Sequence, residues 1–237
     1  MAQLHQGAVR NRLLKAMSSD DFARLQPSLQ LTDLPLQQML IVPNERVQYL
    51  YFLEGGVSSI TARDANGRVE VGMVGWEGLV GAVPILLGSD RVPHDHFMQH
   101  AGEGFRIGAD ALLAAVDVSP PLRRLLLRYV QTELVQTRQT AYVNGSYTIE
   151  ARLARWLLMC HDRVDGDDLL LKHEFLSMML GVQRSGVTLA LQNLEGAGRI
   201  KGRRGRITVI DRELLEALAG GSYGAPEAEY ARLIEGA

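Results

Sequence analysis

Cysteine is nearly absent from this 237-residue chain, which contains only Cys160. One thiol excludes an intrachain disulfide, a four-thiolate zinc site and an iron–sulfur cluster bound by the chain's own cysteines. Long apolar runs are absent as well, because none approaches the roughly 20 residues of a transmembrane helix. The first residues also lack the uninterrupted apolar segment of a secretory signal. We therefore expect a cytoplasmic protein with no membrane partner.

Charge of one sign does not dominate the chain, since its formal net charge is −2. A nucleic-acid partner would therefore have to be inferred from a local concentration of basic residues. The sequence shows no nucleophile–base pair, Walker-type loop or dinucleotide-binding fingerprint, so we expect that the protein is not an enzyme. With 46% hydrophobic and 22% charged residues, the composition is that of an ordinary globular protein.

Short strands separated by turns are predicted between residues 34 and 107. The β-rich segments are Gln48–Leu53, Val57–Thr61 and Val69–Val74, and the last two are separated by Asn66-Gly67. An Asn-Gly pair is typical of a two-residue hairpin, because both positions need positive φ. Two short helices are predicted within residues 1–30. The N-terminal half is therefore predicted to be a small antiparallel β sandwich or barrel.

A single long helix is predicted after Pro120-Pro121, because residues 122–144 contain neither glycine nor proline. Residues at alternating steps of three and four form a stripe with the spacing of a coiled-coil seam. The seam residues are Leu127, Val130, Leu134, Thr137 and Ala141. We expect the seam to pair with the same helix of a second copy, although packing within one chain would give the same pattern. A second helix is predicted from Thr148 to about Val164.

A helix-turn-helix is predicted further along the chain. Apolar residues recur at helical spacing in Lys172–Leu180 and again in Arg184–Glu195, and Gly181–Gln183 separates the two segments. Gly181 suits the end of the first helix, because glycine enters the left-handed conformation without a Cβ penalty.

A basic hairpin is predicted directly after these two helices. Residues 198–210 alternate as two strands around a turn at Gly202–Gly205. The hairpin carries five cations, Arg199, Lys201, Arg203, Arg204 and Arg206. From Lys172 to Arg212 there are eight Lys or Arg against three Asp or Glu, a local charge of +5 in a chain of net charge −2. This concentration favours a winged helix-turn-helix that binds DNA phosphates.

Four segments together resemble the Crp/Fnr family of bacterial transcription regulators: Tyr49–Val57, Glu70–Gly81, Glu150–Leu158 and Phe175–Val182. The resemblance extends from about Asn11 to Ala217. It implies an α+β chain with an N-terminal antiparallel β jelly roll of the cyclic-nucleotide-binding type, a long dimerisation helix and a C-terminal winged helix-turn-helix.

The resemblance also implies the division of the chain. The effector-sensing jelly-roll domain with its N-terminal helices would span residues 1–118, the dimerisation helix 119–144 and the DNA-binding domain 145–220. The tail, residues 221–237, is not explained by the resemblance and is predicted to be either a short terminal helix or disordered.

Members of the family read the major groove with residues at the start of the recognition helix. The matching residues here are Gln183, Arg184, Ser185, Thr188 and Leu189. Arg184 is the leading base reader, because a guanidinium can donate two hydrogen bonds to a guanine. Leu189 departs from the arginine that is common at its position, so the family's usual half-site sequence is not expected. The implied partners are double-stranded DNA, a second copy of the chain and RNA polymerase.

The effector pocket implied by the resemblance differs from that of cyclic-AMP-binding relatives. With Gly81 on the family's glycine, Ala82 replaces the glutamate, and Val92-Pro93 replace the arginine and serine that bind the cyclic phosphate. Arg91 is one residue away, which on a strand turns its side chain to the opposite face. We therefore expect a pocket that does not bind cyclic AMP. The effector is open: a cyclic dinucleotide, a metal or none.

Three histidines, His94, His96 and His100, lie close together in sequence and would project to one face of a strand. Imidazoles in this arrangement could bind zinc, iron, copper or nickel, or could lie solvated in a surface loop. They support an alternative function, in which the barrel senses a metal or small ligand and the C-terminal domain mediates protein contacts.

Overall fold

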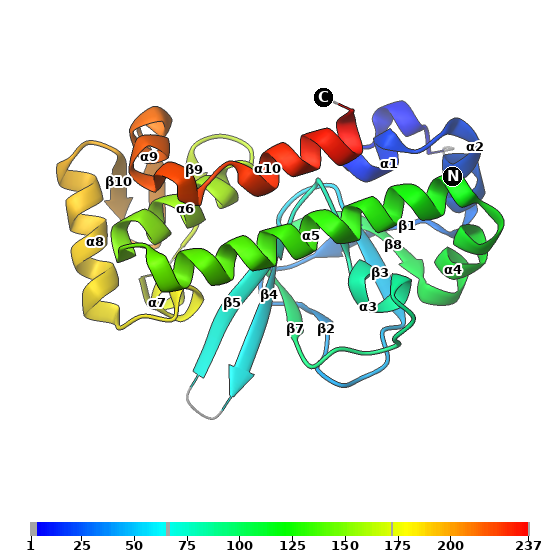
Figure 1. Ribbon diagram of the computed structural model, residues 1–237, viewed down its shortest axis with the longest axis horizontal. Helices are drawn as coiled ribbons and strands as arrows, with labels where there is room; N and C mark the ends of the chain where they lie inside the picture. Colours follow the sequence, from blue (N-terminus) through cyan, green and yellow to red (C-terminus); the bar gives the residue numbers. More distant parts are fainter. Residues whose placement is uncertain (1–3, 65–66, 172, 237) are drawn as a thin grey trace. The chain divides into compact units, whose positions relative to one another are not determined.

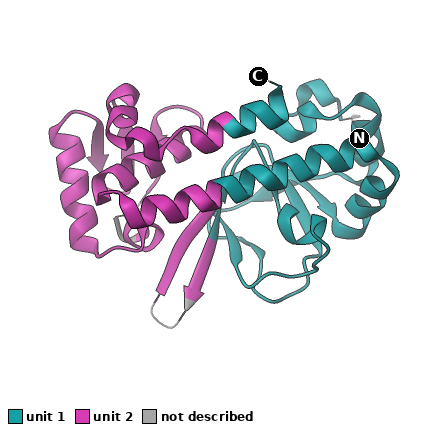
Figure 2. Cartoon of the chain, viewed as in Figure 1, with its two compact units in different colours: residues 1–60, 73–135, 229–237 teal, residues 61–72, 136–228 magenta. Residues whose placement is uncertain are grey.

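The computed structural model describes residues 4–64, 67–171 and 173–236. The chain forms two compact units (Figure 2). Unit 1 consists of residues 1–60, 73–135 and 229–237, and unit 2 consists of residues 61–72 and 136–228. These units are a different kind of division from the predicted domains, whose boundaries after residues 118, 144 and 220 follow the family resemblance. Residues 61–72 belong to the unit that contains the helix-turn-helix, and residues 229–237 belong to unit 1.

Unit 1 begins with two short α-helices, as predicted (Figure 1). The N-terminal elements are η1 (Gln6–Ala8), α1 (Arg12–Ala16), α2 (Ser19–Leu25) and η2 (Gln26–Ser28). Asn11 and Ser18 cap the two α-helices with their side-chain oxygens. Asn11 also donates from its amide to Leu53 O at 3.0 Å and to Gly78 O at 2.8 Å. This buried side chain therefore ties the helices to the sheets.

Two four-stranded sheets form the body of the N-terminal part, which confirms the predicted antiparallel, barrel-like domain. One sheet has the order β1-β8-β3-β6 and the other β2-β7-β4-β5. The strands are β1 (Gln30–Leu34), β2 (Met39–Ile41), β3 (Tyr49–Leu53), β4 (Val57–Asp64), β5 (Gly67–Val74), β6 (Leu79–Val80), β7 (Asp95–His100) and β8 (Gly102–Gly108). Helix α3 (Ala82–Leu86) follows β6. Asn66 of the predicted hairpin turn lies outside the described residues.

Helix α4 (Ala109–Val118) leads into α5 (Pro120–Ser146), which confirms the single long helix. The helix continues through Gly145, which the sequence places beyond its end, to Ser146. Its 27 residues are divided between the two units at Val135/Gln136. Tyr129 lies so close to Gly78 that a Cβ there would meet its hydroxyl. Glycine is therefore required where α5 crosses this loop of unit 1. No described helix is long and apolar enough to cross a membrane.

Unit 2 contains the predicted winged helix-turn-helix. Its elements are α6 (Ile149–His161), β9 (Asp168–Leu169), α7 (His173–Leu180), α8 (Arg184–Gly196), β10 (Ile200–Arg203), β11 (Arg206–Val209) and α9 (Arg212–Ala219). The wing is a three-stranded sheet of order β10-β11-β9, in which β9 is a strand that sequence reasoning missed. Lys172, with which the first helix was predicted to begin, lies outside the described residues.

The C-terminal tail is ordered as helical segments, η3 (Gly220–Ser222), α10 (Ala225–Tyr230) and the π-helical turn η4 (Ala231–Glu235). Of the two predictions for this segment, the short terminal helix is therefore correct.

Strand β7 contains two buried histidines, His96 and His100. Desolvation by burial lowers the pKa of each to about 4. The charge of His94 acts in the same direction on His96, and Asp95 opposes it. Within the described part of the chain, His96 Nδ1 and His100 Nε2 have no hydrogen-bond partner. Both rings are therefore neutral in the folded protein at neutral pH.

These two histidines predict a loss of stability in mild acid. Their folded-state pKa values lie below the ordinary value of about 6.5, so unfolding takes up protons. The stabilisation is fully present above about pH 6.5 and is lost as the pH falls toward 4. We expect each histidine to remove on the order of 1–3 kcal/mol over that range. Urea unfolding at a series of pH values measures the effect.

A variant carrying His96→Gln and His100→Gln keeps polar side chains of similar size that do not titrate. Its free energy of unfolding should fall less steeply with acidification than that of the wild type. Equal slopes in the two proteins would contradict the assignment.

Candidate nucleic-acid interface

The turn between α7 and α8 is built on Gly181. Its φ is +62°, which confirms the predicted left-handed residue. The amides of Gly181 and Val182 donate to Met178 O at 3.2 Å and Ser177 O at 3.1 Å, so the last carbonyls of α7 are satisfied. Gln183 then has an extended backbone and is the N-cap of α8.

One face of α8 is buried and fixes the direction of the other. Val187, Leu191 and Leu194 are buried at helical spacing, and α8 packs against α6 and α7. The opposite face is exposed, because no element within the described part of unit 2 covers it. A rigid helix with one free polar face is the arrangement by which helix-turn-helix proteins enter a major groove.

The residues predicted to read bases lie on the free face, at its N-terminal end. Gln183, Arg184 and Ser185 are exposed, and Leu189 is 57% exposed. Thr188 is half-buried, and its hydroxyl donates to Arg184 O at 2.9 Å. The threonine hydroxyl is therefore partly occupied by its own helix, which leaves Arg184 as the strongest donor on this face.

Sequence reasoning missed Gln192, which is exposed on α8 one helical turn beyond Thr188. Arg184, Thr188 and Gln192 follow one another at steps of four and therefore lie in one row. Asn193 is also exposed, but its amide donates to Glu150 Oε1 at 3.1 Å and is held against α6. The periodicity that revealed the buried face could have found Gln192, since the fourth position after a surface residue shares its face.

The five cations of the wing differ in their contacts. Arg206 forms an ion pair with Asp168 of β9 at 2.9 Å, and Arg199 Nε donates to Leu214 O at 3.2 Å. Lys201, Arg203 and Arg204 are exposed, and within the described residues none of them forms an ion pair. Because Asp168 lies outside the basic segment in sequence, the charge count from residue 172 onward could not include it.

A groove of about 740 Å³ lies between α8 and the wing. Arg184 and Gln192 line it from the helix, and Arg203 and Arg204 line it from the wing. Glu195 Oε1 accepts a hydrogen bond from Gly202 N at 3.1 Å, so the wing is attached to the last turns of α8. Both walls of the groove therefore carry cations, which suits a phosphate backbone.

Residues of the β4–β5 hairpin support this unit from beside the turn. A Cβ on Gly181 would lie 2.9 Å from Val69 Cγ2, so β5 packs directly on the turn. Glu70 is buried and accepts from Trp156 Nε1 at 2.6 Å. A buried indole N–H needs such an acceptor, and this one comes from a segment more than 80 residues away in sequence.

The residues predicted for an effector pocket lie in unit 1. Gly81 has φ +87° and begins α3, in which Ala82 is buried. Arg91 is exposed and pairs with Asp90 at 2.8 Å, and Val92 is half-buried. The sequence argument treated residues 91–93 as part of a strand, but β7 begins only at Asp95. Residues 91–93 lie in a loop, so the strand rule that successive side chains point to opposite faces does not apply to them.

The three histidines are not arranged as predicted. His94 precedes β7, so only His96 and His100 share a face of the strand. Among the described residues, no group of three or more His, Cys, Asp or Glu side chains is placed to hold a metal ion. The structure therefore lends no support to a three-histidine site.

The contact between Gly181 and Val69 predicts the result of a double-mutant cycle. Gly181→Ala should destabilise the protein by about 1–3 kcal/mol, because it adds a left-handed alanine and a close contact. In the double variant, Val69→Ala should restore the stability lost to the close contact but not the stability lost to the left-handed alanine. Thermal unfolding of the four proteins measures both parts. Strict additivity of the two substitutions would show that the valine does not contact this turn.

Comparisons with known proteins agree with this geometry. Residues 151–218 match the family model described as the Crp-like helix-turn-helix domain. No curated protein matches the chain.

Solved structures extend the likeness to most of the chain. A regulator assigned to the Crp/Fnr family from Eubacterium rectale aligns with a TM-score of 0.69 and 16% identity, covering 87% of this chain and 97% of that one. FixK2 from Bradyrhizobium japonicum aligns with a TM-score of 0.69 and 18% identity, and the alignment covers 81% of this chain and 98% of FixK2. The c-di-GMP-responsive regulator CLP of Xanthomonas campestris aligns with a TM-score of 0.62 and 18% identity, and the alignment covers 81% of this chain and 99% of CLP. At these identities the likeness shows the fold.

Proposed function

We propose that this chain, which matches a Crp-like helix-turn-helix model and has the fold of Crp/Fnr-family regulators, is a sequence-specific DNA-binding transcription regulator. It acts as a homodimer on an inverted-repeat site, and an effector other than cyclic AMP controls it through the β domain. The observation that carries the proposal is the free face of α8 beside a wing with three exposed cations, Lys201, Arg203 and Arg204, that form no ion pair with a described residue.

The two parts of this surface have different roles. Arg184 stands at the start of α8, where a recognition helix meets base edges, and its guanidinium can donate two hydrogen bonds to a guanine. The wing cations are charges on a hairpin and fit phosphates, which supply affinity without sequence information. The exposed Leu189 fits an apolar contact with a thymine methyl.

The effector proposal follows from groups that are absent from the pocket. A ribose hydroxyl needs a carboxylate partner and a cyclic phosphate needs a guanidinium. Ala82 and Val92 offer neither, and the guanidinium of Arg91 is exposed and already paired with Asp90. The alternative function, in which the C-terminal domain binds a protein, leaves the unpaired wing cations without a role.

The dimer proposal rests on the exposure of α5. Leu127 is 40% exposed, Thr137 and Ala141 are exposed and Leu134 is half-buried. Val130 of the predicted seam is only 3% exposed, so the exposed residues carry the proposal. Leu127, Leu134 and Ala141 remain at steps of seven, which is the repeat that faces a partner in a coiled coil. Contact with RNA polymerase is part of the proposal and rests on the family resemblance alone.

Substitutions on the two parts of the surface should separate specificity from affinity. Arg184→Ala should reduce the preference for the selected site by about 1–3 kcal/mol and leave salt-dependent binding to random DNA. Arg203→Ala with Arg204→Ala should weaken binding to all DNA and lower the salt slope by roughly two. Binding is measured by fluorescence anisotropy on a site selected from genomic fragments and on random DNA.

The matched control is Arg232→Ala, which removes an exposed cation that pairs with the nearby Glu229 and belongs to unit 1. It should leave both affinities unchanged. Equal loss of specific and non-specific binding in the Arg184 variant would contradict the role of Arg184 as a base reader.

A charge on the exposed stripe of α5 should break the dimer. Leu127→Glu places a carboxylate in the apolar seam and should weaken dimerisation by about tenfold or more. Sedimentation velocity over a range of concentrations measures the shift. Leu87→Glu alters another exposed leucine, at the end of α3, and should sediment like the wild type. An unchanged dimer in the Leu127 variant would exclude this seam.

A further inference from the structure

The chain does not end at the DNA-binding domain. Residues 220–236, here named the C-terminal strap, leave unit 2 at Ala228 and enter unit 1 at Glu229. The strap is helical through most of its length, as η3, α10 and η4. It therefore adds a covalent connection between the two units to those made by α5 and by the two ends of residues 61–72.

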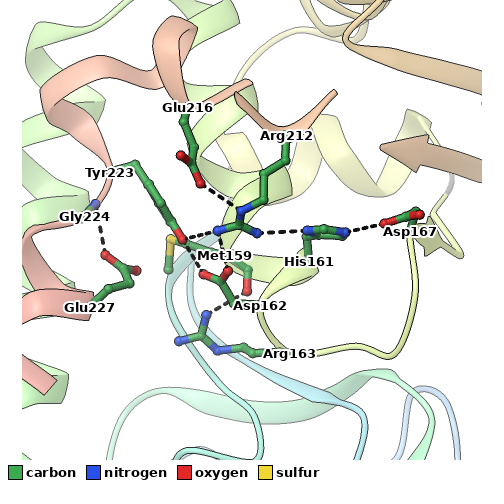
Figure 3. Close-up of polar contacts among 10 residues, drawn as sticks. All are labelled: Met159, His161, Asp162, Arg163, Asp167, Arg212, Glu216, Tyr223, Gly224 and Glu227. Atoms are coloured by element: carbon green, nitrogen blue, oxygen red, sulfur yellow. Dashed lines mark hydrogen bonds and ion pairs between the residues drawn. The ribbon is translucent and has the colours of Figure 1, made fainter. Parts of the chain in front are cut away.

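The strap is anchored in unit 2 through Tyr223 (Figure 3). The Tyr223 hydroxyl donates to Asp162 Oδ2 and accepts from Arg212 Nη2, both at 2.7 Å. Arg212 also donates to Asp162 Oδ1 at 2.8 Å, which closes a three-membered network. Burial raises the pKa of Tyr223 well above its ordinary value, so the hydroxyl keeps its proton. Gln139 of α5 adds hydrogen bonds to Gly221 O and Ser222 O at 3.2 Å.

The strap has a second anchor in unit 1 at Tyr230. This side chain is 6% exposed, and its hydroxyl donates to Glu77 O at 2.7 Å. The guanidinium of Arg12 lies 4.8 Å from the centre of its ring and also pairs with Glu235. Ile234 is buried nearby in sequence. A free tail would bury none of these groups, so residues 229–235 are part of the unit 1 structure.

The spacer between the anchors is short and stiff. Six residues lie between Tyr223 and Tyr230, and α10 takes up most of them. A helix rises about 1.5 Å per residue, so six residues span about 9 Å. Lengthening the spacer requires α10 to unwind or one anchor to break.

We infer that the C-terminal strap is an intramolecular restraint that limits movement of the helix-turn-helix unit relative to unit 1 and thereby sets its DNA affinity. The second part rests on the proposed function, whereas the mechanical part does not. A regulator that couples two sites needs two arrangements with different affinities. The strap limits which arrangements the chain can reach without breaking the hydrogen bonds of Tyr223 or Tyr230.

The mechanical part is tested by the distance between the units in solution. Spin labels at Leu36→Cys and Glu213→Cys place one exposed reporter in each unit, while the buried Cys160 is protected from labelling. Excess unlabelled protein leaves one labelled chain in each dimer. Pulsed electron–electron double resonance then gives the distribution of distances between the two labels for the wild type, Tyr223→Phe, Tyr230→Ala and a chain that ends at Ala228.

Loss of either anchor should broaden the distribution to at least twice its width, because each substitution frees the same spacer. The result from Tyr223→Phe is decisive, since it removes one hydroxyl in unit 2 and leaves the buried contacts of Tyr230 intact. Arg232→Ala is the matched control on the strap and should keep the wild-type width. Circular dichroism confirms that each variant is folded before it is measured. Equal widths in all folded variants would overturn the restraint.

The same variants report the effect on DNA affinity. We expect the anchor variants to change affinity for the selected site by about fivefold or more, which is the lower end of allosteric coupling. Broadened distances with unchanged affinity would overturn the regulatory part. Broadened distances with no DNA binding by any protein, including the wild type, would contradict the proposed function and support the restraint.

Discussion

Helix α6 is the element on which the structure of unit 2 depends, because nine of its 13 residues are buried. It is surrounded by other elements, because α6 packs against α8, α9, β9 and η3. The recognition helix lies on one side of it, and its C-terminal end meets the network of Asp162 and Arg212. The direction of α8, the placement of the wing and the start of the C-terminal strap therefore all follow from the packing of one helix.

The polar groups on α6 explain why residues 61–72 belong to this unit. Trp156 has a buried indole N–H, and Glu70 supplies the acceptor. Arg155 is also buried, and desolvation lowers its pKa while the carboxylates of Glu227 and Glu70 oppose the shift. Its guanidinium donates to Thr140 Oγ1 at 3.1 Å. A buried cation is tolerated only with such partners. These partners come from the hairpin, from α5 and from α10, so one helix links all three segments.

Local patterns made much of this structure predictable from sequence. The apolar spacing of α8 and the requirement of Gly181 for positive φ depend on neighbouring residues, and both are correct. The missed features depend on contacts between distant residues. Arg206 pairs with Asp168 across 38 positions, and Glu70 meets Trp156 across 86. No local periodicity contains these pairings. The error about His94 had a different origin, because the alternation of faces was extended beyond the first residue of β7.

Helix α5 has a buried side and an exposed side, and the buried side fixes which residues are exposed. Leu122, Leu126 and Tyr129 are buried in unit 1, and Tyr129 is fixed over Gly78, where no larger residue fits. The helix therefore cannot rotate about its axis without removing these side chains from the core. Rotation is fixed, so the stripe containing Leu127 is the surface that the helix would offer to a partner. The stripe continues from Leu127 in unit 1 to Ala141 in unit 2, so a helix that paired along it would contact residues of both units.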